Sequence, residues 1–155
     1  MAIPRSRLRD CGVMLMRSTT FALFLGVVYS AFGVLGLIPA ALLPPPPDAP
    51  PLHFTVLSGY LLGVFPVNVL HTAVHLATGF WGLVAWRGFV KSITYCHTVA
   101  MFYGTLCLVG LIPGLNVMYG TLPIHGPDVW LHGVTAVLAA YVAWRAEASP
   151  TRRET

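Results

Sequence analysis

Charged residues are scarce in this 155-residue sequence: they make up 9% of the chain, against about 25% in an average soluble domain. So small a charged fraction cannot cover a water-facing surface, and 56% of the residues are hydrophobic, with a mean hydropathy of +0.74. Cysteine is also rare, with three residues, which excludes a disulfide-stapled domain. The composition therefore predicts a small membrane protein with several spans.

Basic residues are missing from two long intervals, Arg17 to Arg87 and Lys91 to Arg145. A helix needs about 20 apolar residues to cross a bilayer, so each interval can hold two spans and an outer connection. All nine Lys and Arg residues then fall on one side of the membrane, which the positive-inside rule identifies as cytoplasmic. We therefore expect a multi-pass protein of the bacterial inner (cytoplasmic) membrane, with both termini in the cytoplasm.

The hydrophobic runs predict an all-α four-helix bundle with spans at about 19–43, 68–86, 92–112 and 128–144. A basic cytoplasmic tail at 1–18 and a second tail at 145–155 flank this membrane domain, 19–144. The first apolar run is longer than the 7–15 residues of a cleaved signal peptide, so we expect it to be retained. The stretch 52–65 is apolar but too short to span, and we expect an interfacial or partly re-entrant segment on the outer face.

The two halves of the sequence resemble each other, which indicates an internal 2+2 duplication. The tetrapeptide Gly-Leu-Ile-Pro occurs at 36–39 and at 110–113, an offset of 74, and Val-Ala-Trp-Arg occurs at 84–87 and at 142–145. The first outer connection is longer because it carries a proline-rich insert at 44–51. Two-span repeats keep the same orientation, so we expect a pseudo-twofold axis along the membrane normal.

Histidine is the main chemistry-bearing residue inside the predicted spans, where no Asp, Glu, Lys or Arg lies at mid-depth. His71 and His75 are four residues apart and so share one helix face. Asp128 and His132 have the same spacing, and the duplication matches them with His71 and His75. We expect these four side chains to face the bundle axis at similar depths.

Three kinds of ligand fit this pattern. Neutral imidazoles and a carboxylate suit a zinc, copper or iron ion held by all four residues. Alternatively, His75 and His132 could bind a haem axially from two helices, or a single histidine could bind a chlorophyll-type pigment.

A purely structural role is also open: the histidines would hydrogen-bond neighbouring helices, and Asp128 and Asn68 would cap the fourth and second helices. A third role is a protonation switch.

Two blocks of the sequence resemble a known family. They are Phe65–Leu76, followed by Gly79 and Gly82, and Gly110–Asn116, followed by Gly120, Pro123 and Gly126–His132. The chain is similar there to the uncharacterised bacterial four-span membrane proteins of domain of unknown function four-three-eight-three. The resemblance extends from about Thr19 to Trp144 and implies a membrane location without implying an activity. Its pattern carries over to Asn68, His71, His75, Asn116, Asp128 and His132.

No sequence motif specifies a reaction: there is no phosphate-binding loop, nucleophile elbow or Cys-x-x-Cys. The basic residues flank the spans and form no nucleic-acid-binding patch. We therefore expect a non-catalytic accessory or structural subunit that packs against the lipid bilayer, other membrane subunits or its own copies. A His-ligated metal, haem or pigment protein is the alternative, and a small-solute or metal permease is a weaker one.

Overall fold

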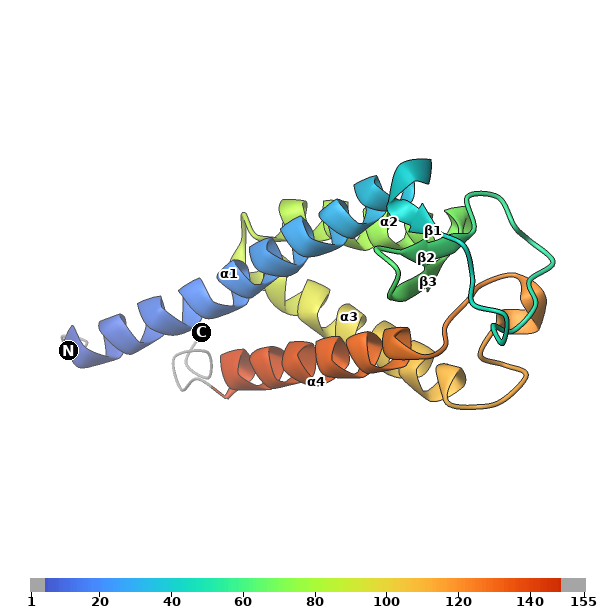
Figure 1. The fold of residues 1–155 in the computed structure, drawn as a ribbon. Helices are drawn as coiled ribbons and strands as arrows, with labels where there is room; N and C mark the ends of the chain where they lie inside the picture. The colour runs from blue at the N-terminus through green and yellow to red at the C-terminus, as the bar shows by residue number, and fades with distance from the viewer. Residues whose placement is uncertain (1–4, 149–155) are drawn as a thin grey trace.

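Four helices dominate the computed structural model, which describes residues 5–148, with side chains described from Ser18 onward. The predicted tail residues 1–4 and 149–155 lie outside the described part of the chain. The helices run antiparallel in two consecutive hairpins (Figure 1). Their bounds are α1 Arg5–Gly36, α2 Val69–Ala85, α3 Phe89–Gly110 and α4 Pro127–Glu147. The expectation of a mostly helical chain with four helices is therefore confirmed.

Helix α1 ends earlier than the apolar run that predicted it, at Gly36 rather than Leu43. Pro39 follows three residues later and begins a short 3-10 helix, Pro39–Ala41. Proline has no N–H group and clashes with the preceding turn, so an α-helix cannot continue through it. The last residues of the predicted 19–43 segment consequently form a turn and a short strand, while residues 5–18 of the predicted tail belong to α1.

The chain segment between α1 and α2 forms a small antiparallel sheet, which the sequence analysis did not predict. Strand β2 (Gly59–Leu61) pairs with β1 (Leu42–Leu43) on one side and with β3 (Phe65–Val67) on the other. The register places Tyr60 opposite Pro66 and Leu61 opposite Phe65. The apolar stretch 52–65 is therefore a loop and hairpin. Together with the 3-10 helix Met118–Gly120, it covers the end of the bundle where α2 and α4 begin (Figure 1).

Glycine allows α1 and α2 to approach closely. A Cβ atom added to Gly82 would lie 2.8 Å from the carbonyl oxygen of Ala22 and 2.8 Å from Cα of Gly26. One added to Gly79 would meet the backbone of Ser30 at less than 3 Å. Backbones in such contact gain dispersion energy that larger residues would prevent, as is typical of helix pairs in lipid.

The outward faces of the helices are strongly apolar. Phe80, Met101 and Trp130 are 69%, 76% and 75% exposed, and many other large hydrophobic side chains share this orientation. Two helices, Ser18–Gly36 and Phe89–Gly110, are long and apolar enough to cross a membrane, and α2 is a shorter apolar helix. The interior, by contrast, holds ten buried polar or charged residues among the described ones.

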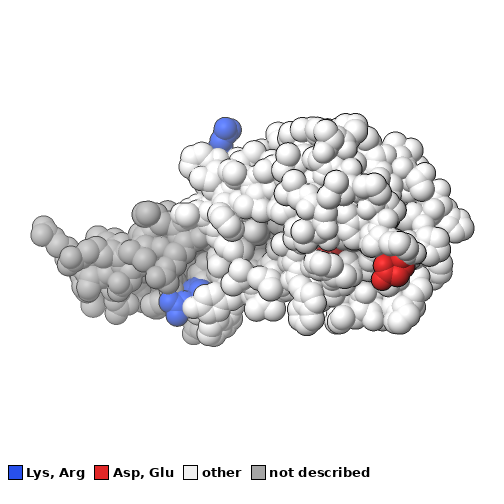
Figure 2. Space-filling view, in the orientation of Figure 1, with Lys and Arg blue, Asp and Glu red and all other residues white. Residues whose placement is uncertain are grey.

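The exposed charged side chains of the described structure lie toward its two ends. The basic residues whose side chains are described, Arg87, Lys91 and Arg145, lie toward the end where α1 begins. On the face that Figure 2 shows, a wide uncharged surface separates the basic groups from an acidic group in the outer loops, residues 37–68 and 111–126, which we call the loop layer. This separation agrees with the two long intervals of the sequence that contain no Lys or Arg.

Replacing Gly82 by alanine should destabilise the protein, because the new methyl group would overlap the α1 backbone. Forcing extra volume into a packed interface typically costs about 1–3 kcal/mol. Gly104→Ala is the matched control: its Cβ would meet only Cβ of Ala136, at 3.7 Å. Since alanine favours a helix over glycine by up to about 1 kcal/mol, this variant should be unchanged or slightly stabilised. Thermal unfolding in detergent measures both, and equal melting temperatures would contradict the close packing.

Candidate functional site

The first two candidate side chains come from the start of α2. His71 and His75 are each 1% exposed and lie one turn apart on the face of α2 that points into the bundle. The N-cap residue Asn68 fixes this first turn, because its side-chain oxygen accepts a hydrogen bond from the backbone N–H of His71. The expectation that Asn68 caps the second helix is confirmed.

Asn68 also connects two segments of the outer loops to the site. Its side-chain nitrogen donates to the carbonyl oxygens of Phe54, at 3.1 Å, and of Thr121, at 2.7 Å. Asn68 is itself fully buried, so these bonds replace water that the group has lost. The start of α2, and with it the position of His71, is therefore set by both outer loops.

The other two candidates come from the start of α4. Asp128 and His132 are both 0% exposed and also lie one turn apart. Asp128 was considered as a helix cap, and this interpretation is wrong: the N-cap is Gly126, with φ of 64°, and no side chain caps the helix. Because Pro127 occupies the first helical position, Asp128 falls inside the first turn, where its side chain points to the bundle interior.

The structure brings the four predicted residues together at the axis. One potential ligand atom from each of His71, His75, Asp128 and His132 lies within 4.8 Å of all the others. The carboxylate is central, since Asp128 Oδ2 is 3.7 Å from His71 Nε2 and 3.5 Å from His132 Nε2. We call these four residues the His/Asp cluster.

The polar atoms of the His/Asp cluster lack hydrogen bonds. Within the part of the chain that the structure describes, neither carboxylate oxygen of Asp128 and none of the six imidazole nitrogens has a partner. Buried polar groups are almost always paired, because an unpaired one costs about 1–3 kcal/mol and a charged one more. Eight such atoms lie together here, and a bound ligand would supply the interactions that they lack.

Two tyrosines, Tyr29 and Tyr103, pack against the His/Asp cluster on the side away from the outer loops, and we call them the tyrosine layer. The ring of Tyr29 lies 5.3 Å from that of His75, and the ring of Tyr103 lies 5.0 Å from that of His132. The Tyr29 hydroxyl hydrogen-bonds Oγ1 of Thr135 at 2.8 Å, and the Tyr103 hydroxyl donates to Oγ1 of Thr78 at 3.2 Å. These contacts hold the imidazoles against rotation and connect α1 with α4 and α3 with α2.

Sequence reasoning did not single out these tyrosines and threonines. The signal was nevertheless present, since Tyr29 and Tyr103 are separated by the repeat offset of 74, and Thr78 and Thr135 by the same 57 positions that separate His75 from His132. Applying the offsets to every polar residue in the spans would have identified them.

The remaining histidines lie outside the His/Asp cluster. His97 is at the other end of the bundle, where its Nε2 is 2.8 Å from Glu147 in an exposed ion pair. His53 is exposed, and its backbone N–H donates to the carbonyl oxygen of Gly120. His125 is half-buried under the loop layer, with its ring 6.3 Å from that of Tyr60.

Comparison with known proteins places the chain in a family. The family described as Domain of unknown function (DUF4383) matches residues 19–145, which is most of the sequence. The chain therefore belongs to this family, as the resemblance in the two blocks indicated. No curated protein and no solved structure matches the chain.

Replacing Asn68 by alanine should destabilise the protein by about 2–3 kcal/mol, because it removes a helix cap and leaves two carbonyl groups without their donor. Asn116→Ala is the matched control, since Asn116 lies half-buried in the second outer loop. Unfolding of both variants followed by circular dichroism in detergent measures the difference. If the two variants melt at the same temperature, Asn68 does not connect the loops as described.

Proposed function

We propose that this protein is a membrane-spanning helical bundle that binds one divalent transition-metal ion at the His/Asp cluster. The observation that carries the proposal is the convergence of four buried, unpaired ligand groups within 4.8 Å. Three imidazoles and one carboxylate are a donor set that zinc accepts in tetrahedral sites. Copper and iron bind similar donors, so the proposal names the class of ion rather than a single element.

The distances suit an ion. Four ligands at about 2.0–2.2 Å from a tetrahedral zinc lie about 3.3–3.6 Å from one another. The two separations from Asp128 Oδ2, 3.5 and 3.7 Å, are close to this range, and a limit of 4.8 Å for the others requires only small side-chain movements. The positive ion would also compensate the Asp128 carboxylate, which otherwise lies in an apolar interior.

A structural role for the histidines is less well supported. Histidines that join helices do so through hydrogen bonds, and among the described residues no imidazole nitrogen of His71, His75 or His132 completes one. The Asp128 carboxylate is the group beside His71 and His132, at 3.7 and 3.5 Å. The ring contacts of His75 with Tyr29 and Phe32 are packing contacts, which an apolar side chain would also make. They do not explain why imidazoles occupy these positions.

A haem between His75 and His132 fits the geometry less well than an ion. Axial ligands bind the iron from opposite faces of the macrocycle, so the space between them must hold a flat ring. Here donor atoms of His71 and Asp128 lie within the same 4.8 Å and would occupy that plane. The pigment alternative, which needs one histidine, does not use the other three residues.

The membrane location rests on the outward surface. A water-soluble protein rarely exposes apolar patches beyond a few hundred Å², whereas large apolar side chains here cover the outer faces of all four helices. The basic groups at one end of the described structure suit the cytoplasmic side of a bacterial inner membrane (Figure 2). On this proposal the loop layer and the His/Asp cluster lie toward the outer side.

The internal duplication is supported by matched contacts. The two tyrosine–threonine hydrogen bonds join positions related by the repeat offsets. Ser18 and Ser92 are also 74 positions apart, and their hydroxyl groups hydrogen-bond each other at 3.1 Å, as equivalent residues beside a pseudo-twofold axis would. We infer that the chain consists of two copies of a helical hairpin, with two metal ligands from each copy.

The predicted role as an accessory subunit stays a prediction. The exposed apolar faces suit neighbouring protein helices and lipid chains equally, and no described feature selects one of them. The permease alternative also stays a prediction.

We expect the purified protein to hold about one zinc ion per chain after loading and washing. Removing two ligands in the double variant His75→Ala/His132→Ala should abolish stoichiometric binding, measured as metal content by mass spectrometry. His97→Ala is the control, because this histidine lies in the exposed pair at the other end and should leave the metal content unchanged.

Thermal stability separates the metal site from a structural role. An ion that binds only the folded state stabilises it by mass action, so a chelator should lower the melting temperature of the wild type and not that of the double variant. A melting temperature that is insensitive to chelator and metal in the wild type would contradict the proposal.

The proposed orientation is testable by cysteine labelling in cells. In a background without Cys11, Cys96 and Cys107, a membrane-impermeant maleimide should label Pro47→Cys in the exposed loop from outside. It should label Ala148→Cys, at the end of α4, only after the membrane is permeabilised. The reverse pattern would contradict the orientation, and recovery of the protein in the soluble fraction would contradict membrane spanning.

A further inference from the structure

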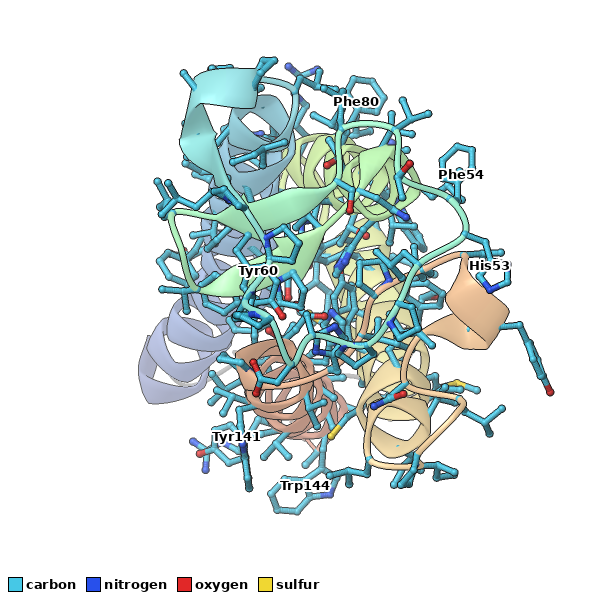
Figure 3. The ribbon with its side chains drawn as sticks, turned by 45° about the vertical axis from the view of Figure 1, so that its right-hand side comes forward. His53, Phe54, Tyr60, Phe80, Tyr141 and Trp144 are labelled. Atoms are coloured by element: carbon cyan, nitrogen blue, oxygen red, sulfur yellow. The ribbon has the colours of Figure 1, made fainter. Side chains whose placement is uncertain are left out.

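A partly enclosed cavity of about 170 Å³ lies in the loop layer, above the start of α2 and α4. Its walls come mainly from the proline-rich insert and from β2, and its floor includes Pro66, Val67 and Pro123. His125 and Tyr60 line it as the polar aromatic side chains. Figure 3 shows Tyr60 over the middle of this end of the molecule, whereas His53 lies at its margin.

The floor of this cavity is directly above the metal site. Pro66 and Pro123, which line the cavity, also place their backbone carbonyl groups near the His71 ring, without completing a hydrogen bond. His71 is the member of the His/Asp cluster that approaches both cavity-lining segments. One layer of backbone therefore separates the cavity from the proposed ligands.

The cavity carries groups suited to a cation. Burial lowers the pKa of His125 below its ordinary value, so the imidazole is neutral at pH 7 and offers a lone pair to a metal ion. Burial raises the pKa of Tyr60, and the negative charge of Asp48, in the exposed part of the insert, raises it further. Asp48 therefore lies near a residue that lines the cavity. A negative group near an opening attracts cations and raises the rate at which they arrive.

The proline-rich insert also makes the first outer loop different from the second. Residues 44–51 have no counterpart in the second half of the sequence, and four prolines of this insert line the cavity. Proline restricts the backbone and has no N–H group, so these walls are stiff and offer no backbone donors that would repel a cation.

We infer that this cavity is the outer entrance to the metal site and that His125 holds the incoming cation transiently before it reaches His71. The inference rests on the proposed metal-binding function and adds a route and a side: the ion enters from the outer face, between Pro66 and Pro123. Asp48 attracts the ion, and the four ligands of the His/Asp cluster then bind it.

Cobalt(II) provides the test, because a tetrahedral cobalt site absorbs visible light and so reports arrival at the buried ligands. Stopped-flow mixing of Co²⁺ with the full chain in detergent gives the association rate, and a chelator chase gives the dissociation rate. In His125→Ala both rates should fall while the equilibrium affinity stays the same, since an entrance group affects entry and exit equally. His53→Ala, an outer-loop histidine that does not line the cavity, should keep the wild-type rates.

A second variant keeps the test independent of His125. Ala49→Trp places a bulky ring in the cavity wall without touching the four ligands, and it too should slow both rates without changing the final cobalt spectrum. Wild-type rates in both variants, or a lower affinity of His125→Ala with unchanged entry, would overturn the entrance and leave the metal site standing. A wild-type protein that develops no cobalt bands would overturn the metal site itself.

Discussion

The burial of one carboxylate among three imidazoles is the constraint on which the rest of the structure depends. Asp128 lies in a bundle interior with 0% exposure and without a described hydrogen bond, so its charged form requires a compensating group beside it. This requirement explains why α2 and α4 must begin at the same depth.

Asn68 transmits this constraint to the outer loops. A single buried amide caps α2 and binds carbonyl groups of two loops that are far apart in the sequence. The loops consequently act as part of the site, because moving either of them would shift the first turn of α2. The outer loops in this way help to position the side chains of the His/Asp cluster.

Much of the fold could be predicted from the sequence because hydrophobic length and charge placement are strong signals. The four helices were expected close to where they occur, except that α1 begins at Arg5, within the predicted tail, and ends before Pro39 rather than at the end of its apolar run. The sheet could not be predicted: its strands have two or three residues, too few to show an alternating pattern. The site residues were found through the duplication, but their lack of hydrogen-bond partners is a property of packing that only the structure reveals.

The match between the halves extends to complementary packing. Gly33 contacts Leu76 in the first hairpin, and the equivalent pair in the second is Cys107 against Gly133. The glycine is on α1 in the first hairpin and on α4 in the second, so each interface pairs a glycine with a larger side chain, supplied by the opposite helix of the repeat.

The pairing of His71 with Asp128 has a consequence for how such a site could arise. A symmetric dimer of separate two-helix chains would place the same residue at both positions, and its site would hold two carboxylates or none. On the proposed duplication, joining the two hairpins in one chain lets the two positions diverge. On the proposed metal-binding function, one acidic group would then face a doubly charged ion. The site would carry a net charge of about +1, a value that two identical halves, with two carboxylates or none, could not give.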